Sequence, residues 1–121
     1  MGQDRHIVVV VDDETDLLEL ICQILEEEGY AVRRLSDPRS ALTLPPVPQP
    51  ALFLVDLMLP GMTGIDLAAK LREYGFANVP LIAMSASNSM LQRAKQSGLF
   101  RALLPKPFDL SVLLDQIGQY A

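Results

Sequence analysis

Hydrophobic and polar positions along this chain form blocks that predict five strands and five helices in strict alternation. Short runs of apolar and β-branched residues indicate strands, and longer segments with apolar residues every three or four positions indicate helices. The predicted strands cover residues 7–11, 30–35, 51–55, 79–84 and 101–104. The predicted helices cover residues 15–28, 38 to about 44, 63 to 75, 87–97 and 109 to about 117.

Residues that favour helix ends support these boundaries. Gly29 and Gly98 follow two of the helical patterns, where glycine commonly forms a C-terminal cap. Asp37, Thr63 and Asp109 precede the other three helical patterns, and each has a side-chain oxygen that can cap a helix N-terminus.

Regular alternation of strand and helix predicts an α/β fold with a parallel sheet covered by helices on both faces. For five strands the common doubly wound order is 2-1-3-4-5, the flavodoxin-like arrangement. The second strand alternates apolar residues with Arg33 and Arg34, so we expect it at an edge of the sheet. There is no repeat or linker in the sequence, which predicts one domain over residues 1–121.

A proline-rich segment at residues 45–50 interrupts this alternation. Four prolines in six residues cannot continue a helix or enter a central strand, and they favour an extended polyproline conformation. A stiff connector between helix and strand explains the segment, although it also contains a PxxP match to ligands of SH3 domains.

Composition and charge narrow the possible partners. The chain has 121 residues, of which 50% are hydrophobic and 21% are charged, and its formal net charge is −5. This acidic balance argues against direct nucleic-acid binding, and no apolar run is long enough for a membrane span. Cys22 is the only cysteine and lies in an apolar helical pattern, so we expect a buried thiol and a cytoplasmic location.

Asp56 ends the most apolar run of the chain and is the centre of the predicted site. Residues 57–64 follow it and contain Pro60, which fixes its own φ, and Gly61 and Gly64, which permit backbone angles closed to other residues. Ligands of open α/β sheets bind beyond the carboxyl ends of the strands. We therefore expect the Asp56 side chain to be presented to a crevice rather than buried.

Other polar residues also follow predicted strands. Asp12 and Asp13 come after the first strand, Ser85 after the fourth and Lys106 after the fifth, so all should meet Asp56 at one edge of the sheet. Each has an ordinary alternative, because aspartate and serine cap helices or start turns and lysine is common in solvated loops. His6, the only histidine, precedes the first strand and is interpreted as structural.

Four short motifs in this order resemble the receiver domain of two-component response regulators, and the resemblance covers essentially the whole chain. The motifs are Val11-Asp12-Asp13-Glu14, Asp56 with Leu59-Pro60-Gly61-Met62-Thr63-Gly64, Ser85-Ala86 and Lys106-Pro107-Phe108. The resemblance implies a phospho-acceptor switch rather than an enzyme, in which Asp56 takes a phosphoryl group from a histidine kinase, a phosphotransfer protein or acetyl phosphate. It also implies a downstream protein or effector domain as partner.

The resemblance further implies a Mg²⁺ site. Asp13 and Asp56 would bind the ion directly, Asp12 through water, and Met58 through its backbone carbonyl. Hard oxygen ligands of this kind suit Mg²⁺. Three carboxylates and Lys106 leave a charge of −2, which Mg²⁺ would cancel before an anionic phosphoryl group arrives.

The remaining site residues would act on the phosphoryl oxygens. Lys106, the Ser85 hydroxyl and the Ala86 amide are expected to stabilise their charge in the transition state. By the same resemblance we expect a cis bond between Lys106 and Pro107.

Two positions depart from the family pattern. Leu103 stands where receivers commonly carry Tyr or Phe, so an aromatic rotamer switch is not available, and we expect the signal to pass through residues 85–90 and the fourth helix. Met58 stands where many relatives have a polar side chain, which predicts slow self-dephosphorylation. Met90 and Leu91 lie in the fourth helix and are either a docking face or part of the core.

Two other function classes stay open at this point. A pseudo-receiver that binds a partner without phosphorylation is the alternative, because of Leu103 and Met58. A phosphatase with an aspartyl-phosphate intermediate would have an Asp-x-Asp-x-Thr motif, whereas Leu57-Met58-Leu59 follows Asp56 here.

Overall fold

A computed structural model describes residues 6–121, so the first five residues of the predicted domain lie outside the described part. Five strands form one parallel sheet in the order β2-β1-β3-β4-β5, which confirms the predicted topology. The strands are β1 (Ile7–Val11), β2 (Ala31–Leu35), β3 (Leu52–Asp56), β4 (Leu81–Ser85) and β5 (Ala102–Pro105). The helices are α1 (Thr15–Glu27), α2 (Pro38–Ala41), α3 (Gly64–Glu73), α4 (Asn88–Ser97) and α5 (Leu110–Tyr120).

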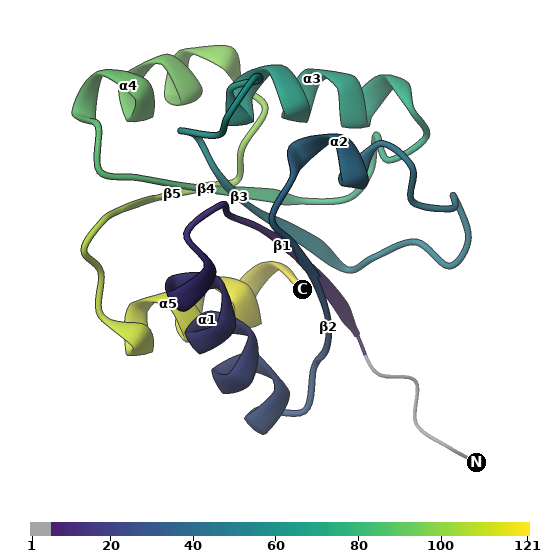
Figure 1. Cartoon of the computed structure of the whole chain (residues 1–121), viewed down its shortest axis with the longest axis vertical. Helices are drawn as coiled ribbons and strands as arrows, with labels where there is room; N and C mark the ends of the chain where they lie inside the picture. The colour runs from purple at the N-terminus through teal and green to yellow at the C-terminus, as the bar shows by residue number, and fades with distance from the viewer. Residues whose placement is uncertain (1–5) are drawn as a thin grey trace.

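Helices cover both faces of the sheet. Figure 1 shows α1 and α5 on one face and α2, α3 and α4 on the other. Successive side chains of a strand point to opposite faces, so Val8 and Val10 pack in the cluster with α1 and α5, whereas Val9 and Val11 pack in the cluster with α3. Burial on both faces explains why the central strands are apolar at nearly every position.

Ion pairs connect the edge strand β2 to helix α1. Arg34 is exposed on this strand, and its guanidinium group forms ion pairs of 2.9 Å with Glu19 and 2.7 Å with Glu26 on α1. The strand order places β2 at an edge of the sheet, which confirms the position predicted from its arginines.

Several predicted elements differ from the observed ones by one to three residues at an end, and at α2 and β4 a neighbouring proline explains the difference. Helix α2 ends at Ala41 rather than near residue 44, because Pro45 disfavours helical angles at the residue before it. The amides of Thr43 and Leu44 instead donate to carbonyls three residues back. Strand β4 begins at Leu81 rather than at residue 79, since Pro80 has no N–H to donate to a neighbouring strand.

Two of the three predicted N-terminal caps are confirmed. The Asp37 carboxylate accepts a hydrogen bond from the Arg39 amide at 2.9 Å, and the Thr63 hydroxyl accepts one from the Asp66 amide at 3.1 Å. Asp109 occupies the N-cap position of α5, but its side chain forms no capping hydrogen bond within residues 6–121, so its predicted capping role is wrong.

The proline-rich segment bends instead of forming the predicted extended polyproline conformation, and its Val47–Pro48 bond is cis. The side-chain amide of Gln49 donates to the carbonyls of Pro46 and Gly75, at 2.9 and 3.0 Å. These bonds attach the segment to the loop after α3, which agrees with a connector.

The sequence predicts that Cys22 is buried, and it leaves Met90 either on an exposed docking face or in the core. Cys22 is fully buried, as predicted, and burial raises the pKa of its thiol to about 11. Met90 is buried against Leu57, Ala83 and Ala94, so it belongs to the core rather than to an exposed docking face. Within residues 6–121, no helix combines the length and the apolar character needed to cross a bilayer.

Candidate functional site

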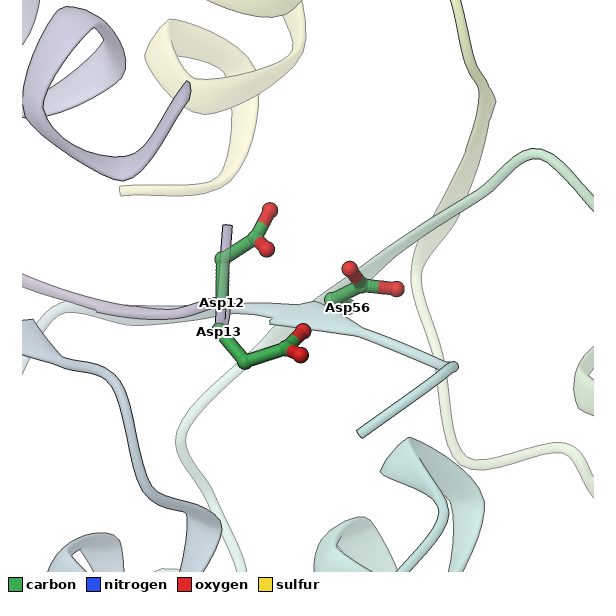
Figure 2. Close-up of side chains that lie close together, drawn as sticks. All are labelled: Asp12, Asp13 and Asp56. Carbon is green, nitrogen blue, oxygen red and sulfur yellow. The ribbon is translucent and has the colours of Figure 1, made fainter. Parts of the chain in front are cut away.

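Three carboxylates meet at the carboxyl ends of two neighbouring strands. Val11 of β1 is paired with Val55 of β3, so Asp12 and Asp56 follow these residues side by side. The ligand oxygens of Asp12, Asp13 and Asp56 all lie within 4.8 Å of one another. Figure 2 shows the three side chains grouped at the ends of the two strands. The predicted convergence of these acids is confirmed.

The three acids differ in burial. Asp12 is 0% and Asp56 is 4% exposed, whereas Asp13 is exposed. The expectation that Asp56 is presented rather than buried is therefore wrong. Its carboxylate lies at the bottom of the site because Asp56 is the last residue of β3, with fully buried neighbours on both sides in the chain, and because Lys106 covers it.

The turn after β3 holds the Asp56 carboxylate in place. The Met58 amide donates to Asp56 Oδ1 at 2.9 Å. Gly61 has a φ of +77°, as predicted, but Gly64 is required for a different reason. A Cβ atom at Gly64 would lie 2.5 Å from the Asp56 carbonyl oxygen and 2.8 Å from Leu57 Cα, so close backbone approach excludes any side chain there.

Lys106 connects the acids from the other side of β4. Its Nζ atom lies 2.9 Å from Asp56 Oδ2, 3.1 Å from Asp12 Oδ2 and 3.3 Å from Glu14 Oε1. Its side chain is only 12% exposed, and the predicted cis bond to Pro107 is confirmed. One largely buried ammonium group therefore forms ion pairs with three carboxylates.

Burial and hydrogen bonding shift the pKa values of Asp12 and Lys106 in opposite directions. Burial raises the pKa of Asp12 to about 6, although hydrogen bonds from the Glu14 amide and from Lys106 oppose the increase. Burial by itself would lower the pKa of Lys106, but hydrogen bonds to Asp56 and Asp12 outweigh it and raise that pKa. The lysine thus stays charged, and the buried acids depend on it for compensation.

The other predicted site residues, Ser85, Ala86 and Met58, differ in burial. Ser85 is buried at the end of β4, and its hydroxyl oxygen accepts a hydrogen bond from the Ser87 amide at 3.0 Å. Ala86 is exposed and lines an open hollow together with Lys106. The Met58 side chain is 56% exposed, next to the buried Asp56.

Glu14 is the last residue of the first motif, and the sequence assigns it no role. It contacts Lys106 through its carboxylate, and its backbone amide donates to Asp12 Oδ1 at 2.9 Å. Its residue type could have indicated a role in the site, because glutamate is not among the residues preferred at a helix N-cap.

Comparison with known proteins identifies the family. The model of the family "Response regulator receiver domain" matches residues 8–118. The chain belongs to this family. Receiver domains are phospho-accepting switches that work with histidine kinases or phosphotransfer proteins, and the three acids with Lys106 form the acidic site of this receiver domain. The same three acids can hold a metal ion.

Individual relatives differ in how much of their length the receiver domain covers. It is 39% identical to the DNA-binding response regulator MtrA of Mycobacterium tuberculosis, over 71% of this chain but only 37% of MtrA. It is 28% identical to sporulation initiation phosphotransferase F of Bacillus subtilis, over 93% of this chain and 91% of the relative. The chain thus spans about a third of MtrA and nearly all of the phosphotransferase.

Solved structures give the same result for the fold. The receiver domain of the Francisella response regulator 1452 superposes with a TM-score of 0.84 at 28% identity, over 96% of each chain.

Proposed function

We propose that Asp56 accepts a phosphoryl group from the phosphohistidine of a histidine kinase or phosphotransfer protein, or from acetyl phosphate. With phosphohistidine as donor, an Asp56 carboxylate oxygen attacks phosphorus, an O–P bond forms, the P–N bond breaks, and its electron pair goes to the imidazole nitrogen; with acetyl phosphate the P–O bond breaks and acetate leaves. The observation that carries this proposal is the 2.9 Å contact between Asp56 and Lys106, beside two further carboxylates. This group combines a nucleophile with a cation for the incoming phosphoryl oxygens.

Charge in the site supports a requirement for Mg²⁺. Three carboxylates and one ammonium group leave a formal charge of −2 where an anion must enter. We propose that Asp12, Asp13, Asp56 and the Met58 carbonyl hold Mg²⁺, since hard oxygen ligands suit this ion. Bound Mg²⁺ would supply the positive charge that lets the phosphoryl group approach.

Lys106, Ser85 and Ala86 are proposed to stabilise the phosphoryl oxygens. Lys106 contributes its ammonium group and Ala86 its backbone amide. The Ser85 hydroxyl oxygen accepts from the Ser87 amide, which leaves the hydroxyl proton to be donated elsewhere. A phosphoryl oxygen on Asp56 is a suitable acceptor for that proton.

The same serine offers a route for the signal. Ser87 connects Ser85 to α4, because its amide binds the Ser85 hydroxyl and its own hydroxyl caps the Met90 amide at 3.2 Å. Movement of Ser85 towards a phosphoryl group would therefore pull on the first turn of α4. We propose this route as the output, towards a downstream protein or effector domain, because Leu103 cannot act as an aromatic switch. Unchanged amide chemical shifts in residues 85–90 upon addition of Mg²⁺ and beryllofluoride would contradict it.

We also propose that residues 1–121 form one receiver domain that acts in the cytoplasm. The family model, which matches residues 8–118, supports the single domain, and the free, buried thiol of Cys22 supports the location.

Intact mass spectrometry tests the proposed function. The protein and its Asp56→Asn variant are incubated with acetyl phosphate, with and without Mg²⁺. We expect one added phosphoryl group that requires both Mg²⁺ and Asp56. If neither acetyl phosphate nor a panel of phosphorylated histidine kinases modifies the protein, while Mg²⁺ still binds, the proposal is wrong and a phosphorylation-independent interaction module replaces it.

A further inference from the structure

Glu14 occupies the N-cap position of α1 without acting as a cap. Within the described residues its side chain forms no capping hydrogen bond to the helix. Serine, threonine, aspartate and asparagine are preferred at this position because a short side chain can reach the next amides. The start of the helix therefore does not account for a glutamate here.

The Glu14 side chain turns to the site instead. Its Oε1 atom lies 3.3 Å from Lys106 Nζ, which also contacts Asp12 and Asp56. Two of these three carboxylates are almost fully buried, at 0% and 5% side-chain exposure, whereas the Glu14 side chain is 65% exposed. Glu14 is thus the outermost negative charge on the lysine.

Glu14 also borders an open surface next to Lys106. It lines an open hollow of roughly 530 Å³ together with Ala86, Lys106 and Phe108. A phosphoryl donor that approached the buried Asp56 past Lys106 would place its leaving group on the side of the hollow. The leaving group would then lie close to the Glu14 carboxylate, which contacts the same lysine.

We propose that Glu14 determines phosphoryl-donor specificity by charge, an inference that rests on the proposed phosphorylation of Asp56. Its carboxylate repels donors with an anionic leaving group, such as acyl phosphates, and tolerates donors whose leaving group is a neutral or protonated nitrogen, such as phosphohistidine and phosphoramidate. A unit charge at the protein surface changes the energy of a nearby ion enough to alter a rate several-fold. The site is thereby biased towards phosphoramidate-type donors.

The test compares two small donors that differ in their leaving group. Acetyl phosphate loses acetate as its P–O bond breaks, and phosphoramidate loses ammonia as its P–N bond breaks. Rates of Asp56 phosphorylation are measured with each donor, in Mg²⁺, for the wild type, Glu14→Gln and Glu14→Asp. We expect Glu14→Gln to raise the ratio of the acetyl phosphate rate to the phosphoramidate rate by about 3- to 10-fold. The effect should shrink as ionic strength rises, and Glu14→Asp should restore most of the wild-type ratio.

Asp16→Asn is the matched control, because it removes the same charge from the same first turn of α1. It should leave the donor ratio unchanged. If the wild type is phosphorylated but Glu14→Gln has the wild-type ratio, or if Asp16→Asn shifts the ratio equally, Glu14 does not set specificity while the proposed function stands. If no donor modifies the wild type, the proposed function fails and this inference fails with it.

Discussion

The Lys106 ammonium nitrogen lies 2.9 Å from Asp56 Oδ2, although the two residues are 50 positions apart in the chain. They belong to segments on either side of β4, so the lysine must reach across the end of a whole strand. This contact, with the one to Asp12, compensates two buried carboxylates at the same time.

Replacement of this lysine should therefore weaken both the fold and the site. In Lys106→Ala, two buried carboxylates lose their cation, and we expect the free energy of unfolding without Mg²⁺ to fall by about 3 kcal/mol at pH 7.5. The phosphorylation rate should fall about 100-fold, as when one donor to a developing negative charge is removed. Urea unfolding and intact mass measure these effects. Lys95→Ala, on the exposed last turn of α4, is the control, and equal losses in both variants would contradict the assignment.

The buried carboxyl group of Asp12 should make stability depend on pH. Its pKa is raised from 3.8 to about 6 in the folded protein, so the folded state holds the proton more tightly than the unfolded state. The resulting stabilisation is complete below pH 3.8 and is lost as the pH rises through about 6. Relative to Asp12→Asn, the wild type without Mg²⁺ should lose about 2 kcal/mol of unfolding free energy between pH 4 and pH 7. A constant difference between the two proteins in urea titrations would show that Asp12 ionises normally.

Met58 should slow the loss of the phosphoryl group. Its side chain is apolar, 56% exposed and two residues beyond Asp56, so it can shield an acyl phosphate from water. In Met58→Asn a polar amide can orient an attacking water, and we expect dephosphorylation to become roughly 10-fold faster. The decay of the phosphorylated mass with time measures this rate. Met58→Leu is the matched apolar control and should stay slow, whereas equal decay in the asparagine variant would refute the shielding role.

Gly64 tests how closely the turn packs on the acceptor residue. An alanine Cβ there would lie 2.5 Å from the Asp56 carbonyl oxygen, which is backbone and cannot rotate away. We expect Gly64→Ala to lower the free energy of unfolding by about 2 kcal/mol. Gly118→Ala is the control, because Gly118 lies inside α5 with no atom within 4 Å of the added Cβ. Gly118→Ala should stabilise the helix by about 0.8 kcal/mol. An unchanged free energy of unfolding in Gly64→Ala would show that the turn can relax.

Much of the architecture follows from the sequence because its signals are local. Apolar runs and helical periodicity predict all five strands and all five helices, and strict alternation predicts a parallel sheet. Since the carboxyl ends of parallel strands meet at one edge, the meeting of Asp12, Asp13 and Asp56 follows from the order of the elements. The exact ends of several elements differ from the predicted ones, and at α2 and β4 the neighbouring prolines outweighed periodicity.

The tertiary structure alone decided the environment of each site residue, because burial and contact depend on elements far apart in the chain. Asp56 is buried since its strand lies in the middle of the sheet and Lys106 closes over it from beyond β4. Gly64 is required because helix α3 begins against the backbone of Asp56 and Leu57, not because of its own dihedral angles. Glu14 gained its position on Lys106 in the same way, through a contact spanning 92 residues that no local pattern predicts.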